Sequence, residues 1–179
     1  MQSFDHLEVA WQSLPPAPRG RGWVRLIVLR KGNEVHEVAA RAELSPERGL
    51  HGDRWELGAA PEPASQVTLM SVRVAELIGA GTRPLGLAGD NFLVDLDLGE
   101  DALPVGSRLR LGNAVLQVSD MPHLGCKKFS ARFGQEALRW INWKPHRVRR
   151  LRGVNCRVVA GGTVTLGDPV DILADGCAV

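Results

Sequence analysis

One cysteine lies in a setting that favours a reactive thiol. Cys126 is part of the segment HLGCKKFSARFG (residues 123–134), and three cations follow it closely: Lys127, Lys128 and Arg132. A helix is predicted to start near Lys127, so Cys126 would lie at its N-terminus, where unpaired N–H groups and the helix dipole stabilise an anion. The thiolate is the form that attacks electrophiles or binds metals. The pattern therefore favours a functional thiol over a packed, inert one.

Two other kinds of thiol chemistry remain open from the residues alone. His123 and Cys126 have the HxxC spacing of zinc ligands. His146 and Cys156 would complete four ligands, although no second closely spaced pair accompanies them. A Cys–His hydrolase would use His123 or His146 as base and Asp120 to orient it. Both are minority hypotheses beside a single functional cysteine.

Polar residues in two glycine turns and one strand are candidates to shape a pocket. GLHGDRW contains Asp53 and Arg54, which either contact a ligand or pair with each other to fix the loop. Asn91, in AGDNF, has turn chemistry but can also hydrogen-bond a heterocycle. Gln66 and Thr68 alternate with apolar residues, so on a strand both would point to one face and line a pocket.

A second cationic cluster follows the predicted helix and is the best candidate for binding an anion. Arginine forks suit phosphate or carboxylate, while a solvated basic face is the alternative. The cluster consists of Lys144, His146, Arg147, Arg149, Arg150 and Arg152.

The elements that must position these residues are mostly short strands. Residues 108–118 read as a hairpin around Gly112-Asn113, and 127–142 as one substantial helix interrupted by Gly134. Many short strands, glycine turns and few helices predict a mainly β fold, a small barrel or sandwich. We expect an N-terminal arm over 1–21, one domain over 22–175 and a tail over 176–179.

Composition limits the classes of function. The chain has 179 residues, 44% of them hydrophobic and 23% charged, which is a normal globular balance, and its net charge of +2 indicates no nucleic-acid partner. There is no apolar run long enough to cross a bilayer and no secretory signal, so we expect a cytoplasmic protein. Three cysteines are too few for a disulfide framework. Cys156 fits a core strand, and Cys177 is incidental.

Together these segments resemble the MOSC family, named for the C-terminal domain of molybdenum cofactor sulfurases. GLHGDRW (49–55), QVTLMS (66–71), GLAGDNF with the residues that follow it (86–118) and HLGCKKFSARFG (123–134) occur in the expected order. The resemblance runs from about residue 22 to 173. It implies a closed, mostly antiparallel, pyruvate kinase barrel-like β-barrel with a few peripheral helices.

The resemblance also implies a link to the molybdenum cofactor. The cysteine matched by Cys126 carries sulfur as a persulfide in the sulfurases and ligates molybdenum in the amidoxime-reducing branch, whose substrates are N-hydroxylated compounds. We therefore expect Cys126 as metal ligand and catalytic residue. The cofactor-binding residues expected are Arg54, Thr68, Asn91, Lys127, Lys128, Arg132, Arg147 and Arg149.

The chain departs from its multidomain relatives. It lacks the pyridoxal phosphate desulfurase domain of the eukaryotic sulfurases, so we expect it to make no use of pyridoxal phosphate and to receive sulfur from a separate cysteine desulfurase. It has no ferredoxin-like cysteine cluster, so electrons would come from a separate transfer protein. The expected ligand is a small-molecule cofactor or substrate, with neither nucleic acid nor membrane as partner.

Overall fold

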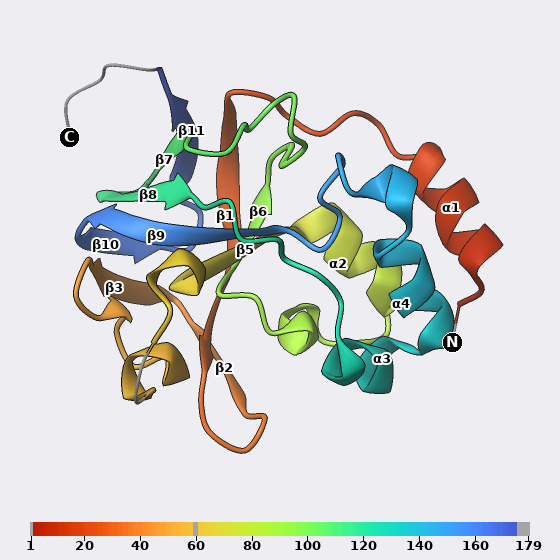
Figure 1. Cartoon of the computed structure of the whole chain (residues 1–179), viewed down its shortest axis with the longest axis horizontal. Helices are drawn as coiled ribbons and strands as arrows, with labels where there is room; N and C mark the ends of the chain where they lie inside the picture. The colour runs from red at the N-terminus through yellow and green to blue at the C-terminus, as the bar shows by residue number, and fades with distance from the viewer. Residues whose placement is uncertain (1, 59–60, 175–179) are drawn as a thin grey trace.

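The computed structural model describes residues 2–58 and 61–174. Its strands gather on one side of the molecule and its α-helices on the other (Figure 1). The α-helices are α1 (Phe4–Gln12), α2 (Val72–Gly79), α3 (Lys127–Phe133) and α4 (Gln135–Ile141). The strands are β1 (Arg21–Arg30), β2 (His36–Ala39), β3 (Arg41–Ser45), β4 (Gly49–Leu50), β5 (Val67–Ser71), β6 (Phe92–Asp95), β7 (Arg108–Leu111), β8 (Ala114–Val118), β9 (Val154–Ala160), β10 (Gly162–Thr165) and β11 (Pro169–Leu173). Four 3₁₀ turns connect them: η1 (Arg54–Leu57), η2 (Pro63–Ser65), η3 (Leu85–Ala88) and η4 (Lys144–His146).

Seven strands close into a barrel. Their order is β1-β6-β5-β9-β8-β7-β11, and β11 pairs back onto β1 through Arg21↔Asp171 and Gly22↔Val170. Every pair in the ring is antiparallel except β5–β6. Strand β2 extends the sheet beyond the ring by pairing with the end of β1, and β10, β3 and β4 form a small second sheet. The predicted mainly β, mostly antiparallel closed barrel is confirmed.

Alternating side chains on the strands separate two cores. On β6, Phe92 and Val94 point into the barrel, while Leu93 between them packs against the helices. On β5, Leu69 points inward and Met70 outward in the same way. This period of two is what strand geometry requires when both faces are buried. The barrel wall therefore also serves as the platform on which the helices lie.

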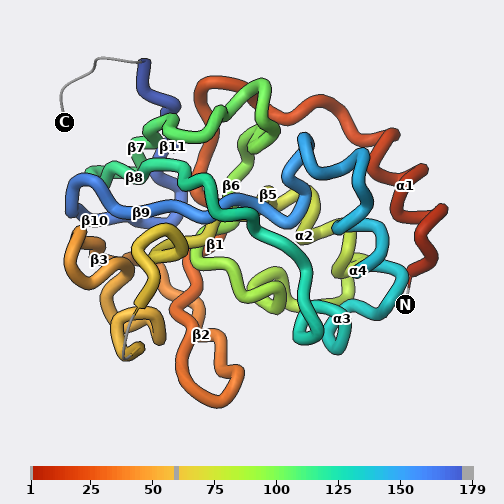
Figure 2. The backbone as a smooth tube through the Cα atoms, viewed as in Figure 1, coloured from red at the N-terminus to blue at the C-terminus, as the bar shows by residue number. Residues whose placement is uncertain are grey.

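The helical layer includes the N-terminal segment predicted as an arm. Helix α1 runs beside α4 (Figure 2). Its Leu7 is fully buried in the helical core, and the ring of Trp11 meets that of Trp140 edge-on, with centroids 6.4 Å apart. Residues 2–12 are thus packed against the segment that follows Cys126.

Several local predictions can be compared with the structure. The hairpin at Gly112-Asn113 is confirmed as β7–β8. The single helix over 127–142 divides at Gly134, with a φ of 95°, into α3 and α4. The predicted tail, 176–179, and Cys177 lie outside the described residues. In the described part of the chain, no helix has the length and apolar character needed to cross a membrane.

Candidate functional site

Cys126 is an exposed, free thiol at the N-cap position of α3. The backbone N–H groups of Phe129 and Lys128 face the sulfur without completing a cap hydrogen bond. Partial burial raises the pKa of the thiol, but these N–H groups and the charges of Arg152 and Arg132 lower it by more, so the pKa of Cys126 lies below its ordinary value. These N–H groups and arginines are thus the local cause of the predicted preference for the thiolate form.

The glycine before the cysteine is required by packing. A Cβ on Gly125 would come within 2.8 Å of Leu138 Cδ1 and 3.0 Å of Ile141 Cγ2, both on α4. Asn142, just after α4, donates to the Gly125 carbonyl at 2.9 Å and accepts from its N–H at 2.8 Å. The cysteine loop is therefore fastened to α4. The space that Gly125 leaves is filled by α4.

A buried polar cluster lies beside the thiol. Arg152, 9% exposed, pairs through Nη1 with Asp90 Oδ2 at 2.5 Å and places its guanidinium 5.6 Å from the Phe129 ring centre. His123 Nδ1 lies 3.5 Å from Asp90 Oδ1. Burial, followed by the charge of Arg152, lowers the pKa of His123 to about 3, so its imidazole is neutral at physiological pH. Within the described residues, Asp90 Oδ1, His123 Nδ1 and Arg152 Nε are buried without a hydrogen-bond partner.

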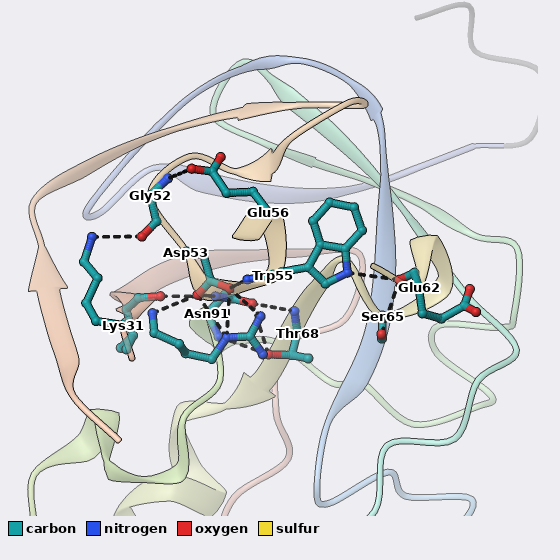
Figure 3. A network of polar contacts seen from close by, with 11 residues as sticks. Lys31, Gly52, Asp53, Trp55, Glu56, Glu62, Ser65, Thr68 and Asn91 are labelled. Atoms are coloured by element: carbon teal, nitrogen blue, oxygen red, sulfur yellow. Dashed lines mark hydrogen bonds and ion pairs between the residues drawn. The ribbon is translucent and has the colours of Figure 1, made fainter. Parts of the chain in front are cut away.

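The next residue, Asn91, hydrogen-bonds to Asp53 of the GLHGDRW segment (Figure 3). Its Nδ2 donates to Asp53 Oδ2 at 2.9 Å, and its Oδ1 accepts from the Thr68 N–H at 3.0 Å. Asp53 pairs with Arg30, with Nη2 2.8 Å from Oδ1. Burial raises the pKa of Asp53, but the hydrogen bonds and charge of Arg30 lower it by a larger amount. The pKa of Asp53 therefore lies below the usual range.

This network corrects two sequence-based predictions. The partner of Asp53 is Arg30 on β1, so the expected Asp53–Arg54 pair is wrong; Arg54 is exposed at the start of η1. Gln66 and Thr68 are both buried, and Gln66 donates to the Pro46 carbonyl and accepts from Val158 N–H. The side chains expected to line a pocket instead hydrogen-bond inside the protein.

The cations that follow Cys126 have different surroundings. Lys127 is exposed. Lys128 and Arg132, one turn apart on α3, both pair with Glu34 in the loop between β1 and β2. Arg132 also donates to the Leu87 carbonyl at 3.1 Å. The positive charge beside the thiol is therefore partly neutralised within the chain.

Arg147 and Arg149, both predicted to hold phosphate, open onto different cavities. Arg147 and Arg152 line a cavity of about 290 Å³ together with His123 and Asn155. Arg149 lines another cavity, of about 650 Å³, beside α1. Cys126 is not among the residues that line the arginine-rich cavity, although Leu124, two residues earlier, is.

The side chains considered as zinc ligands or as the base of a hydrolase are engaged or buried elsewhere. His146 Nδ1 contacts the Trp140 carbonyl and Nε2 lies 3.0 Å from Glu8, so both ring nitrogens are engaged. Cys156 is fully buried on β9, where burial raises its pKa to about 12. Across the described ranges, no group of three or more His, Cys, Asp or Glu side chains is placed to hold a metal ion. The zinc prediction is therefore wrong, and His123, with a pKa of about 3, is a weak base at neutral pH.

Two residues of the site region were not found from the sequence. Arg30 ends an apolar strand, and Glu34 lies in the turn KGNE; neither has a local pattern that points to Asp53 or to α3. Asp90 likewise shows only the turn pattern of AGDNF, yet it is the buried partner of Arg152. Only tertiary contacts bring these three side chains to their partners, which are Asp53, α3 and Arg152 respectively.

Comparisons with known proteins agree with this architecture. The family model described as "MOSC domain" matches residues 62–171. YuaD from Bacillus subtilis is 18% identical with a TM-score of 0.59, and the match covers 88% of this chain and 98% of that one. YiiM from Escherichia coli is 20% identical with a TM-score of 0.57, covering 88% and 72%. No curated protein matches the sequence. Because the family model spans more than half of the residues and the solved structures share the barrel, the chain belongs to the MOSC domain family.

Proposed function

We propose that the protein binds a molybdopterin-type molybdenum cofactor and that Cys126 is the protein ligand to the metal. The MOSC family is linked to this cofactor, and the observation that carries the proposal is the environment of Cys126. The thiol is exposed, its pKa is lowered, and the charges of Arg132 and Arg152 act on it. A soft thiolate suits molybdenum.

The donor set fits the cofactor in its main features. Cys126 supplies one thiolate, and Lys127, Lys128 and Arg132 on α3 provide cations that would hold the cofactor's phosphate. The exposed Arg54, whose charge acts on His36 together with that of Arg132, would add charge near α3. Arg147 would add charge from the cavity that Leu124 also lines, and Arg149 only from the α1 side.

Thr68 and Asn91 support the site from behind. Both belong to the buried network, and the backbone of Asn91 continues directly into Asp90, the partner of Arg152. When bound, the cofactor would supply two-electron chemistry, with reduction of N-hydroxylated compounds as the proposed reaction and a separate electron-transfer protein as donor. We further propose a cytoplasmic location, because the free thiol of Cys126 fits a reducing compartment.

The test is the metal content of protein expressed with molybdate. We expect molybdenum and pterin to co-purify with the wild-type protein and to be lost in Cys126→Ala. Equal molybdenum content in both proteins would contradict the ligand role. Cys156→Ala is the matched control, because it removes a buried thiol and should leave the metal content unchanged.

A sulfur-carrier role is the second candidate, favoured by the exposure of the same thiol. The Cys126 thiolate would attack the outer sulfur of a desulfurase persulfide; the new S–S bond forms on Cys126, and the desulfurase cysteine leaves as a thiolate. Mass spectrometry after incubation with a cysteine desulfurase and cysteine should then show one added sulfur on the Cys126 peptide. An unmodified peptide under conditions that load a known acceptor would contradict this role.

A further inference from the structure

The turn between β1 and β2 brings an acidic side chain to the cysteine region. In Figure 1 this β-hairpin projects beyond the barrel. At its tip, Glu34 forms ion pairs with both Lys128 and Arg132, two of the three cations that follow Cys126 on α3. One carboxylate oxygen meets each cation, so Glu34 is placed as a phosphate or carboxylate group of a ligand would be.

The tip is held in an unusual backbone conformation. Asn33 and Glu34 both have left-handed φ values, 56° and 62°. Asparagine tolerates this region, but a glutamate there is uncommon and persists only when surrounding contacts fix it. A two-residue hairpin turn requires positive φ at both central residues, and this one is closed by the hydrogen bond from the Val35 N–H to the Gly32 carbonyl at 3.2 Å. On this turn the Glu34 side chain is held by its two ion pairs with α3.

Polar contacts dominate the rest of the hairpin's attachment. Val35 and Val38 remain 54% and 62% exposed, so they anchor little of the hairpin in a core. His36 Nδ1 contacts the Gly86 carbonyl at 3.0 Å, and Lys31 Nζ donates to the Gly52 carbonyl at 2.8 Å. Such contacts are readily exchanged for water or for a ligand.

We propose that Glu34 occupies an anion-binding position beside Cys126 and is displaced when the phosphate, or another oxyanion group, of the ligand binds to Lys128 and Arg132. The inference rests on the proposed role of these two cations in holding the cofactor. It adds to that role an internal competitor: the hairpin tip covers the cations until a stronger anion replaces it.

The electrostatics favour exchange over simple addition. Glu34 carries one negative charge, whereas a phosphate monoester carries up to two and has more acceptor oxygens. Arg132 keeps its hydrogen bond to Leu87 while its partner changes, so the guanidinium remains positioned. Burial, followed by the charge of Arg132, lowers the pKa of His36, so this ring carries less positive charge than an unperturbed histidine would.

Two alkylating reagents test the proposal on the whole chain. Neutral iodoacetamide and anionic iodoacetate both react with the thiolate, so the ratio of their rates at Cys126 cancels any change in thiolate fraction and reports attraction of an anion. In Glu34→Gln, this ratio should rise about fivefold at low ionic strength, as expected for one unit charge removed at about 4 Å in water. The rise should shrink in high salt. Peptide mass spectrometry separates Cys126 from Cys177.

Inorganic phosphate provides the second measurement. It should slow the iodoacetate reaction of Glu34→Gln at no more than about one fifth of the concentration that the wild-type protein needs, because phosphate carries at least one negative charge. Chloride at equal ionic strength, which only screens the charges, should slow the reaction less than phosphate does. Adding Lys128→Gln to Glu34→Gln should remove the gain, because it removes one of the two cations that bind the anion.

Glu37→Gln is the matched control. Glu37 lies on the same hairpin, is exposed, and pairs with Lys31 at 3.6 Å, so its substitution removes the same charge away from α3. A Glu34→Gln protein that behaves like Glu37→Gln in both measurements would overturn the proposal. Neither measurement needs bound molybdenum, so a fivefold effect in protein that never acquires the metal would support the anion position and contradict only the cofactor.

Discussion

His123 Nδ1 lies 3.5 Å from Asp90 Oδ1 in the buried cluster behind the cysteine loop. The second carboxylate oxygen of Asp90 accepts a hydrogen bond from Arg152. The Asp90 carboxylate thus links His123, in the loop before Cys126, to Arg152, which lies just before β9. Its loss would disturb both.

We expect Asp90→Asn to destabilise the fold strongly. The substitution leaves the Arg152 guanidinium, 9% exposed, without its anion, and breaking a buried pair in this way costs about 3 kcal/mol. Urea denaturation measures the change in the free energy of unfolding. Asp101→Asn is the control, because Asp101 is 62% exposed in its pair with Arg19 and should change stability little. Similar losses in the two variants would contradict the account.

The neutral state of His123 makes stability depend on pH. Its pKa is about 3 in the folded protein against 6.5 for an unperturbed histidine, so as pH falls below 6.5 the unfolded chain binds a proton that the folded chain does not. The contribution of neutral His123 to the free energy of unfolding is therefore fully present above pH 6.5. It declines toward pH 3, by at most about 1.4 kcal/mol per pH unit. Denaturation series from pH 7 to pH 4 should show a shallower decline in His123→Gln. Parallel curves would show that another group dominates.

The two described cysteines should differ in reactivity. Partial burial acts against the Cys126 thiolate but is outweighed by nearby N–H groups and arginines, whereas burial raises the pKa of Cys156 to about 12. Iodoacetamide at pH 7.5 should modify Cys126 and leave Cys156 unmodified in the folded protein. The pH midpoint of the Cys126 reaction should lie below 9.0, the ordinary value for a thiol. Peptide mapping checks both; rapid modification of Cys156 would indicate that β9 opens.

A glycine beside Arg152 is required by a close approach of two strands. Gly153 has a φ of 100°, and a Cβ there would lie 1.9 Å from the Leu69 carbonyl oxygen. We expect Gly153→Ala to lower the free energy of unfolding by about 3 kcal/mol. Gly106→Ala shares the positive φ, 87°, but has open space around its Cβ, so it isolates the backbone strain. Equal effects would mean that the clash relaxes without cost.

The sequence was sufficient to predict the strands and a mainly β fold, because short-range patterns determine them, whereas the closed barrel was expected from the family resemblance. The Gly112-Asn113 turn and the alternation in β5 and β6 specify strands locally, and the position of Cys126 at a helix start follows from the residues around it. The partners of Asp53, Asp90 and Arg132 could not be predicted, since each pairs with a residue far away in the chain. Long-range pairing depends on the closed barrel, which no local pattern encodes.

X-ray absorption at the molybdenum edge counts the sulfur neighbours of the metal and so reports whether Cys126 is a ligand. Protein loaded with the cofactor should show one more sulfur neighbour of the metal in the wild type than in Cys126→Ser, while Cys156→Ala should match the wild type. An identical number of sulfur neighbours in wild-type and Cys126→Ser protein, at equal metal loading, would mean that Cys126 does not bind molybdenum.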